Sequence, residues 1–184
     1  MKFVYGNAQV SRAKLTTVNF NDDFLLLGFS IVAIALPFAL HSAEFPNQLL
    51  VGTIVNALLA GSALYLSFGK SLPVIILPSI AALASGFVFN SFTPFLAFLL
   101  PAIWLGNGIY VHAIKGLAVD GKMNYFISVL AASILKSAII GIGALMLFFF
   151  ALIPQSLVLP MSLIQFATAV LGGAIAGASL YLKK

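Results

Sequence analysis

Cysteine is absent from this chain of 184 residues. Disulfide bonds, thiolate metal sites and cysteine catalysis are therefore excluded, although the redox compartment stays open. The sequence also lacks a nucleotide-binding loop, a His-Glu metal motif and any pair of carboxylates within an apolar run. We accordingly expect a protein that is not an enzyme, with no metal site and no cofactor.

Charge is scarce as well. Only 7% of the residues are charged and 62% are apolar. In soluble domains about 25% of the residues are charged and roughly 45–50% are apolar. A water-soluble fold of this length would have to bury too much apolar surface. The net charge of +5 comes from basic residues scattered singly between apolar runs, which suits anchors at a lipid bilayer and not nucleic acid. The composition predicts an integral membrane protein.

Long apolar runs are what the chain has instead. A spanning helix needs about 20 apolar residues, and the runs are continuous, unlike the alternating strands of a barrel. Only Asn90 and Ser91 separate the third run from the fourth, which predicts a tight helical hairpin. The sequence predicts one all-α domain over residues 1–184, a polytopic membrane bundle of about six transmembrane helices at 24–40, 49–68, 72–89, 92–111, 125–152 and 159–182.

The basic residues predict an orientation in the cell membrane. With six crossings, both termini and the second and fourth connections lie on one side, and that side holds Lys2, Arg12, Lys14, Lys70, Lys115, Lys122, Lys183 and Lys184. The other connections hold no Lys or Arg. The positive-inside rule then places both termini in the cytoplasm. The first apolar run begins only at Phe24, after a polar lead over residues 1–23, so we expect no cleaved signal peptide and a cytoplasmic lead.

Lys136 is the main candidate for a functional residue. It lies in the fifth run, roughly 18 Å from the cytoplasmic start of that helix at 1.5 Å per residue. Intramembrane charges are costly and usually face a bundle interior or a water-filled cavity, and no acidic residue lies within any predicted span. Lys136 would then bind a carboxylate, a phosphate or a polarised carbonyl. The alternative is a structural lysine that extends toward lipid headgroups or binds helix carbonyls.

Two amide side chains are expected near the level of Lys136. Asn56 and Gln165 each lie about six residues from the outer end of their runs, roughly 9 Å below the surface. They could share a site with Lys136 or only join helices by hydrogen bonds. For Asn107 we favour a structural hydrogen bond, and for Trp104 packing and cavity lining remain equally open.

Small residues at four-residue spacing predict close helix contacts. Ala169, Gly173 and Gly177 form such a stripe in the last run, and Ala35 and Ala39 have the same spacing in the first. These stripes are expected to pack within the bundle, although any one of them could dock a partner protein.

The chain resembles the substrate-binding (S) components of energy-coupling-factor (ECF) transporters over about residues 46–180. The resemblance rests on Gln48 to Leu59 (QLLVGTIVNALL), Leu77-Pro78-Ser79, Pro101 to Tyr110 (PAIWLGNGIY), Lys136, and Gln165 to Gly173 (QFATAVLGG). It implies a six-helix bundle that captures a vitamin-like micronutrient, or in some members a metal ion, from outside. The implied substrate-binding residues are Asn56, Lys136, Gln165, Gln48, Trp104 and Asn107.

The resemblance also implies partners. In such components an Ala-x-x-x-Ala pattern on the first helix faces a membrane coupling protein, which Ala35 and Ala39 would do here. ATPase subunits would supply the energy, and the chain itself would bind only its small-molecule ligand. Two alternatives remain open from the residues alone: a non-catalytic structural subunit of a larger membrane complex, and a small membrane enzyme or pore.

Overall fold

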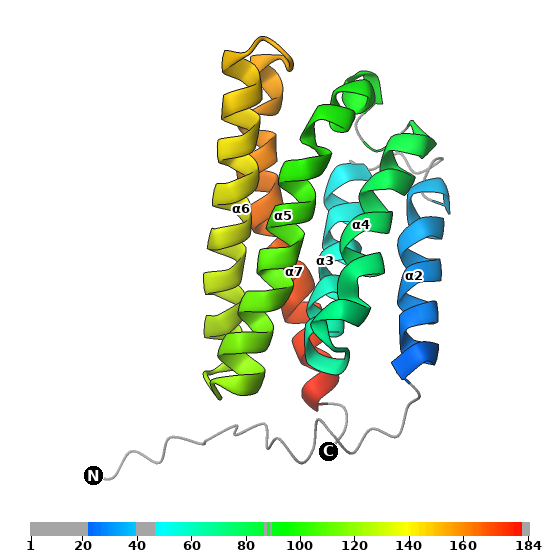
Figure 1. The fold of residues 1–184 in the computed structure, drawn as a ribbon, viewed down its shortest axis with the longest axis vertical. Coiled ribbons are helices and arrows are strands. Elements are labelled where there is room, and N and C mark those ends of the chain that lie inside the picture. The colour runs from blue at the N-terminus through cyan, green and yellow to red at the C-terminus, as the bar shows by residue number, and fades with distance from the viewer. Residues whose placement is uncertain (1–21, 40–46, 87, 89, 182–184) are drawn as a thin grey trace, which may run out of the picture.

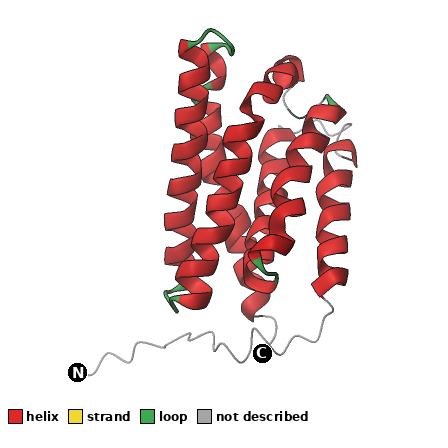
Figure 2. Ribbon diagram, in the orientation of Figure 1, coloured by secondary structure: helices red, strands yellow, loops and turns green. Residues whose placement is uncertain are grey.

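The computed structural model describes residues 22–39, 47–86, 88 and 90–181. Its six long helices are apolar enough to cross a membrane, and the described part of the chain contains no strand (Figures 1 and 2). The predicted all-α, six-helix membrane bundle is confirmed. The helices are α2 (Asp22–Ala39), α3 (Asn47–Tyr65), α4 (Phe68–Ser85), α5 (Leu96–Ile114), α6 (Tyr125–Phe149) and α7 (Pro160–Tyr181).

The helix bounds differ from the predicted runs where backbone geometry intervenes. Ser67 is extended, with φ −68° and ψ 156°, so α3 ends before it and α4 begins at Phe68. Gly86 then ends α4 with a left-handed φ of 75°, a conformation that glycine adopts without strain. Three short segments were not predicted: two 3₁₀ turns, η1 (Asn90–Phe95) and η3 (Gln155–Leu157), and the π-helical turn η2 (Lys115–Asp120).

Some predictions fall on residues whose structure is not described. These are most of the lead that was predicted to be cytoplasmic, at residues 1–21, the end of the first predicted helix at residue 40, and most of the connection that follows, at 41–46. Residues 87 and 89 of the third predicted helix and residue 182 of the sixth are not described either. The basic residues at 2, 12, 14, 183 and 184 lie outside the described part as well.

Helix packing brings distant parts of the chain together. α6 packs along α5 and α7, α7 also packs along α3, and α2 lies against α4 at the edge of the bundle (Figure 1). The buried apolar side chains form two clusters, one with Leu59, Tyr110 and Ala132, the other with Val51, Ile103 and Ile140. Asn56, Asn107 and Lys136 lie between these residues in sequence and are buried too. Buried polar residues therefore lie between the two apolar clusters along α3, α5 and α6, while Val55 packs against both clusters.

Glycines on α7 allow its close approach to the neighbouring helices. A Cβ on Gly173 would lie 2.4 Å from Val129, and one on Gly177 would lie 2.4 Å from the Tyr125 ring. The Tyr125 hydroxyl donates to the Gly173 carbonyl over 2.8 Å. The small-residue stripe predicted in the last run thus packs within the bundle, where any larger side chain would collide with its neighbours.

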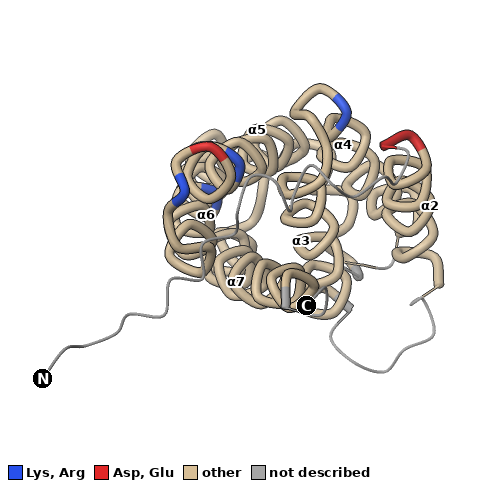
Figure 3. Tube along the Cα trace, turned by 90° about the horizontal axis from the view of Figure 1, so that it is seen from below, with Lys and Arg blue, Asp and Glu red and all other residues tan. Residues whose placement is uncertain are grey.

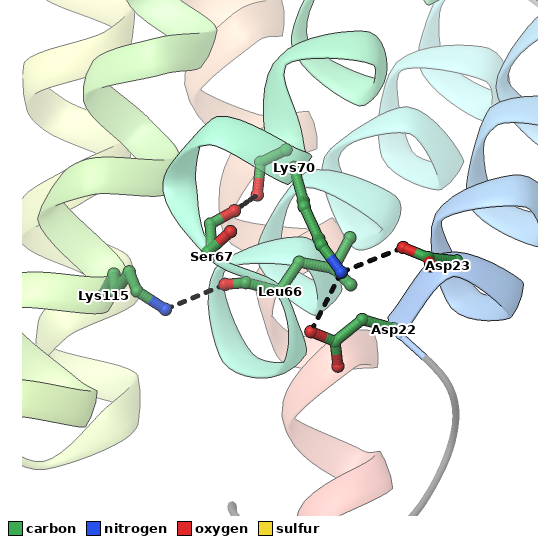
Figure 4. Close-up of polar contacts among 7 residues, drawn as sticks. Asp22, Asp23, Leu66, Ser67, Lys70 and Lys115 are labelled. Carbon is green, nitrogen blue, oxygen red and sulfur yellow. Dashed lines mark hydrogen bonds and ion pairs between the residues drawn. The ribbon is translucent and has the colours of Figure 1, made fainter.

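Apart from Lys136, the charged residues that the structure describes lie at the end of the bundle with the α3–α4 and α5–α6 connections. Figure 3 looks along the bundle from below. Lys70 at the start of α4 lies 2.9 Å from Asp23 and 3.4 Å from Asp22 at the start of α2. Lys115 donates to the Leu66 carbonyl over 2.8 Å (Figure 4). Lys136 is the one described basic residue away from this end, so its position needs a separate explanation.

Candidate functional site

Lys136 lies in the middle of α6 and is 1% exposed. Its Nζ donates a hydrogen bond of 2.5 Å to Asn56 Oδ1 on α3. The same nitrogen lies 5.3 Å from the centre of the Tyr110 ring on α5, within the range of a cation–π contact. Among the described residues no carboxylate pairs with it. The charge is thus held by an amide oxygen and a ring face.

Asn56 is fixed in the orientation that Lys136 requires. Its Nδ2 donates to the Gly52 carbonyl over 2.8 Å and to Thr168 Oγ1 on α7 over 3.1 Å. Thr168 in turn donates to the Ile164 carbonyl over 2.8 Å. Because Lys can only donate and both amide hydrogens are used, the Asn56 oxygen must face Lys136. Asn56 therefore positions the ammonium group and has no hydrogen left for a ligand.

A partly open cavity lies beside this pair. Its volume is about 70 Å³. No residue of α2 lines it. Its lining comes from α3, the end of α4, the following connection, α5, α6 and the start of α7. The cavity thus lies toward the end of the bundle where α3, α5 and α7 begin, opposite the charged end. Figure 1 shows these helix starts at the top of the bundle. The lining residues are Gln48, Val51, Gly52, Val55, Asn56, Pro78, Ser79, Ala82, Val88, Leu96, Ile103, Asn107, Lys136 and Gln165.

Two glutamines offer polar groups to the cavity. Gln48 Nε2 is buried and has no hydrogen-bond partner among the described residues. Buried polar groups are rarely left unpaired, so this amide is suited to a ligand or a bound water. Gln165 also lines the cavity and is half-buried. Both lie near the starts of their helices, α3 and α7.

The opposite wall is held by hydrogen bonds between α4 and α5. Trp104 Nε1 donates to Ser79 Oγ over 2.8 Å, and Ser79 donates to the Ile76 carbonyl over 2.8 Å. Asn107 Nδ2 donates to the Ile75 carbonyl over 3.1 Å. Pro78 has no N–H, so the α4 backbone lacks one helical hydrogen bond at this level. These side chains fix α5 against the turn of α4 that proline weakens.

The structure brings most of the predicted substrate-binding residues together. Asn56, Lys136, Gln165, Gln48 and Asn107 line the same cavity. Trp104 is not one of the lining residues, but it donates a hydrogen bond to Ser79, which is. The structural role favoured for Asn107 agrees with its hydrogen bond to α4.

The predicted docking residues, Ala35 and Ala39, lie on the exposed surface of α2, away from the cavity. Pro37 between them is buried. The two alanines are therefore free to meet lipid or a partner, and nothing in the described bundle covers them.

Sequence reasoning did not single out Tyr110, Thr168 or Ser79 as members of the site. Tyr110 lies three residues after Asn107, and Thr168 lies three residues after Gln165. Residues at this spacing share a helix face. A search for polar side chains one turn from each predicted site residue would have found both. The hydrogen bond of Ser79 to Trp104 depends on how α4 and α5 pack, which such a search does not use.

The lining residues are mostly apolar and carry few groups that can change charge. The lining contains one cation, three amide side chains besides Asn56 and one hydroxyl, but no carboxylate, imidazole or thiol among the residues that form the walls. Groups of three or more possible metal ligands are absent from the described residues. The arrangement can donate hydrogen bonds to a bound acceptor and attract negative charge.

No protein-family model matches the chain, and comparison with the curated proteins and with the solved structures gives no match either.

Proposed function

We propose that the protein is a substrate-binding subunit of a membrane importer of the energy-coupling-factor type. It captures a small micronutrient from outside and performs no chemistry of its own. The observation behind this proposal is the cavity at Lys136, where a buried ammonium has an amide oxygen and an aromatic ring beside it but no described carboxylate.

The energetics of a buried charge support a ligand. Moving an ammonium out of water costs several kcal/mol, and one amide oxygen with a ring face returns only part of that cost. A packing role alone would be met better by an apolar side chain of similar volume, because such replacements are often neutral or stabilising. A lysine that binds an anionic or polar ligand is the simpler explanation.

The transport cycle would need partners. The sequence has no nucleotide-binding loop, so the proposal assigns energy supply to ATPase subunits. A membrane coupling protein would contact α2, where Ala35 and Ala39 are exposed. With both termini in the cytoplasm, the cavity would lie in the outer half of the membrane, on the side from which the substrate arrives.

A non-catalytic structural subunit of a larger membrane complex is the second candidate. It is favoured by the exposed apolar face of α2, which buries only Ala33 and Pro37 and exposes Phe24, Ile31 and Phe38 by half or more. Lipid can cover such a face as well as a partner can. This function would leave the cavity and its lysine without a role, so we rank it second.

The test is native mass spectrometry of the protein extracted gently from its own membranes. We expect a bound small molecule on the native protein that is lost in Lys136→Met, together with co-purified coupling and ATPase subunits. Lys70→Met is the matched control, because it removes a lysine at the charged end and should keep the molecule.

The same measurement can contradict the proposal. A native protein with no small molecule bound, isolated in an unrelated membrane assembly, would favour the structural subunit. Equal retention of the molecule by Lys136→Met would remove Lys136 from the binding site. Thermal melting of each variant in detergent shows whether the bundle has stayed folded.

A further inference from the structure

We infer that the ligand of the cavity is a small monocarboxylate, a molecule with one negative charge and a short apolar body. This inference rests on the proposed substrate-capture function and names the class of molecule that is captured. It follows from the sign of the charge, from hydrogen-bond donors on Lys136 and Gln48 that have no described partner, and from the size and walls of the cavity.

The single positive charge of Lys136 determines the sign and the number of charges on the ligand. Lys136 is the one cation in the lining, and the lining contains no acidic residue. Its ammonium has three hydrogens, and Asn56 accepts one hydrogen bond from it. Two remain for a carboxylate. A phosphate or a dicarboxylate would bring a second negative charge into a buried site with no second cation to pair it, which is strongly unfavourable.

Several polar groups of the lining are already paired inside the protein. Both Asn56 hydrogens are bound to Gly52 and Thr168. The Ser79 hydroxyl accepts from Trp104 and donates to Ile76. The buried polar atom left without a described partner is Gln48 Nε2, which is a donor. Donors on Lys136 and Gln48 require acceptors on the ligand, and carboxylate oxygens are acceptors only.

The remaining walls are apolar and close together. Val51, Val55, Ala82, Val88, Leu96 and Ile103 line the cavity. Its 70 Å³ is about half of the roughly 150 Å³ cavity that admits benzene in an engineered protein. The space therefore suits a carboxylate with a chain of a few carbon atoms, and the apolar walls favour a chain without further charges.

Three matched probes test the class on the purified full-length protein in detergent. Butyrate carries one negative charge, butyramide has nearly the same shape without it, and butylamine carries a positive charge. Binding is measured by titration calorimetry and by the shift of the melting temperature. We expect butyrate to bind at least about tenfold more tightly than butyramide, because it forms charge-assisted hydrogen bonds, and butylamine not to bind.

Substitutions in the lining test whether the preference for butyrate arises in the cavity. Lys136→Met should abolish the preference for butyrate over butyramide, whereas Lys70→Met should keep it. Gln48→Leu should weaken butyrate binding by about fivefold, as expected for one hydrogen bond. If Lys136→Met does not fold, Lys136→Arg, which keeps the charge, and Gln48→Leu still provide the comparison.

Butyramide or butylamine binding as tightly as butyrate would overturn the monocarboxylate class. If none of the probes binds, the molecule retained in native mass spectrometry decides. A co-purified monocarboxylate of another size supports the class, and a retained molecule of any other chemistry overturns it while the capture function stands. No probe bound and no molecule retained would overturn both.

Discussion

At the scale of single residues, Lys136 and Asn56 behave as one unit. The lysine supplies the charge, and the asparagine supplies an oxygen whose direction is set by Gly52 and Thr168. Among the described hydrogen bonds, Lys136 Nζ donates only to Asn56. Their contributions to the free energy of unfolding should therefore be coupled. Two single substitutions and the double variant can measure this coupling.

Asn56→Leu should lower the free energy of unfolding by about 2–4 kcal/mol, because it leaves a buried ammonium without its acceptor. Thermal melting in detergent measures the loss. The double variant Asn56→Leu with Lys136→Met should recover most of it, since an apolar pair of similar shape leaves no buried group unpaired. Additive losses in the double variant would show that the two side chains are energetically independent.

At the scale of the elements, α7 is held by close backbone approach to its neighbours. The Tyr110 hydroxyl donates to the Ala169 carbonyl over 2.7 Å, and the Tyr125 hydroxyl donates to the Gly173 carbonyl. Both hydrogen bonds require the helix backbone to lie against a tyrosine ring. Glycine at position 173 makes this possible, because a Cβ there would lie 2.8 Å from the Tyr110 hydroxyl.

Gly173→Ala should therefore destabilise the bundle by about 1–3 kcal/mol, the usual cost of inserting a methyl group into a packed contact. Gly108→Ala on α5 is the matched control, because a Cβ there meets nothing within 4 Å. We expect the control to stay within about 1 kcal/mol of the native protein. Melting temperatures compared in the same detergent give both values, and equal effects of the two changes would contradict the packing at α7.

At the scale of the whole molecule, the two ends of the bundle differ in their described charged residues. Lys70, Lys115 and Lys122 lie at the end that carries the α3–α4 and α5–α6 connections, with Asp22, Asp23 and Asp120 (Figure 3). The cavity occupies the other half. If the positive-inside rule holds, the charged end is cytoplasmic and the cavity is nearer the outside.

Single introduced cysteines test this orientation without background, because the native chain has none. Ser156 in η3 and Met123 before α6 are exposed at opposite ends. In intact cells a membrane-impermeant maleimide should label Ser156→Cys, whereas Met123→Cys should react only after the membrane is permeabilised. The reverse pattern would place the cavity toward the cytoplasm and contradict capture from outside.

Composition and run length were enough to predict six spanning helices. A chain with 62% apolar residues can satisfy its backbone in lipid only through helices or a closed barrel, and continuous apolar runs exclude the barrel pattern. The ends of the helices were less predictable, because hydropathy carries no information about backbone conformation. Ser67, which is extended, and Gly86, which is left-handed, end helices inside or beside apolar sequence.

The sequence by itself also predicted the depth of the polar residues, since each residue adds about 1.5 Å along a helix. It thus placed Asn56, Lys136 and Gln165 near one level of the membrane. Only the tertiary structure decided which way they face, because the rotation of a helix about its own axis depends on its neighbours. The packing of α3, α5, α6 and α7 turned these residues toward one cavity and brought the Tyr110 ring to Lys136.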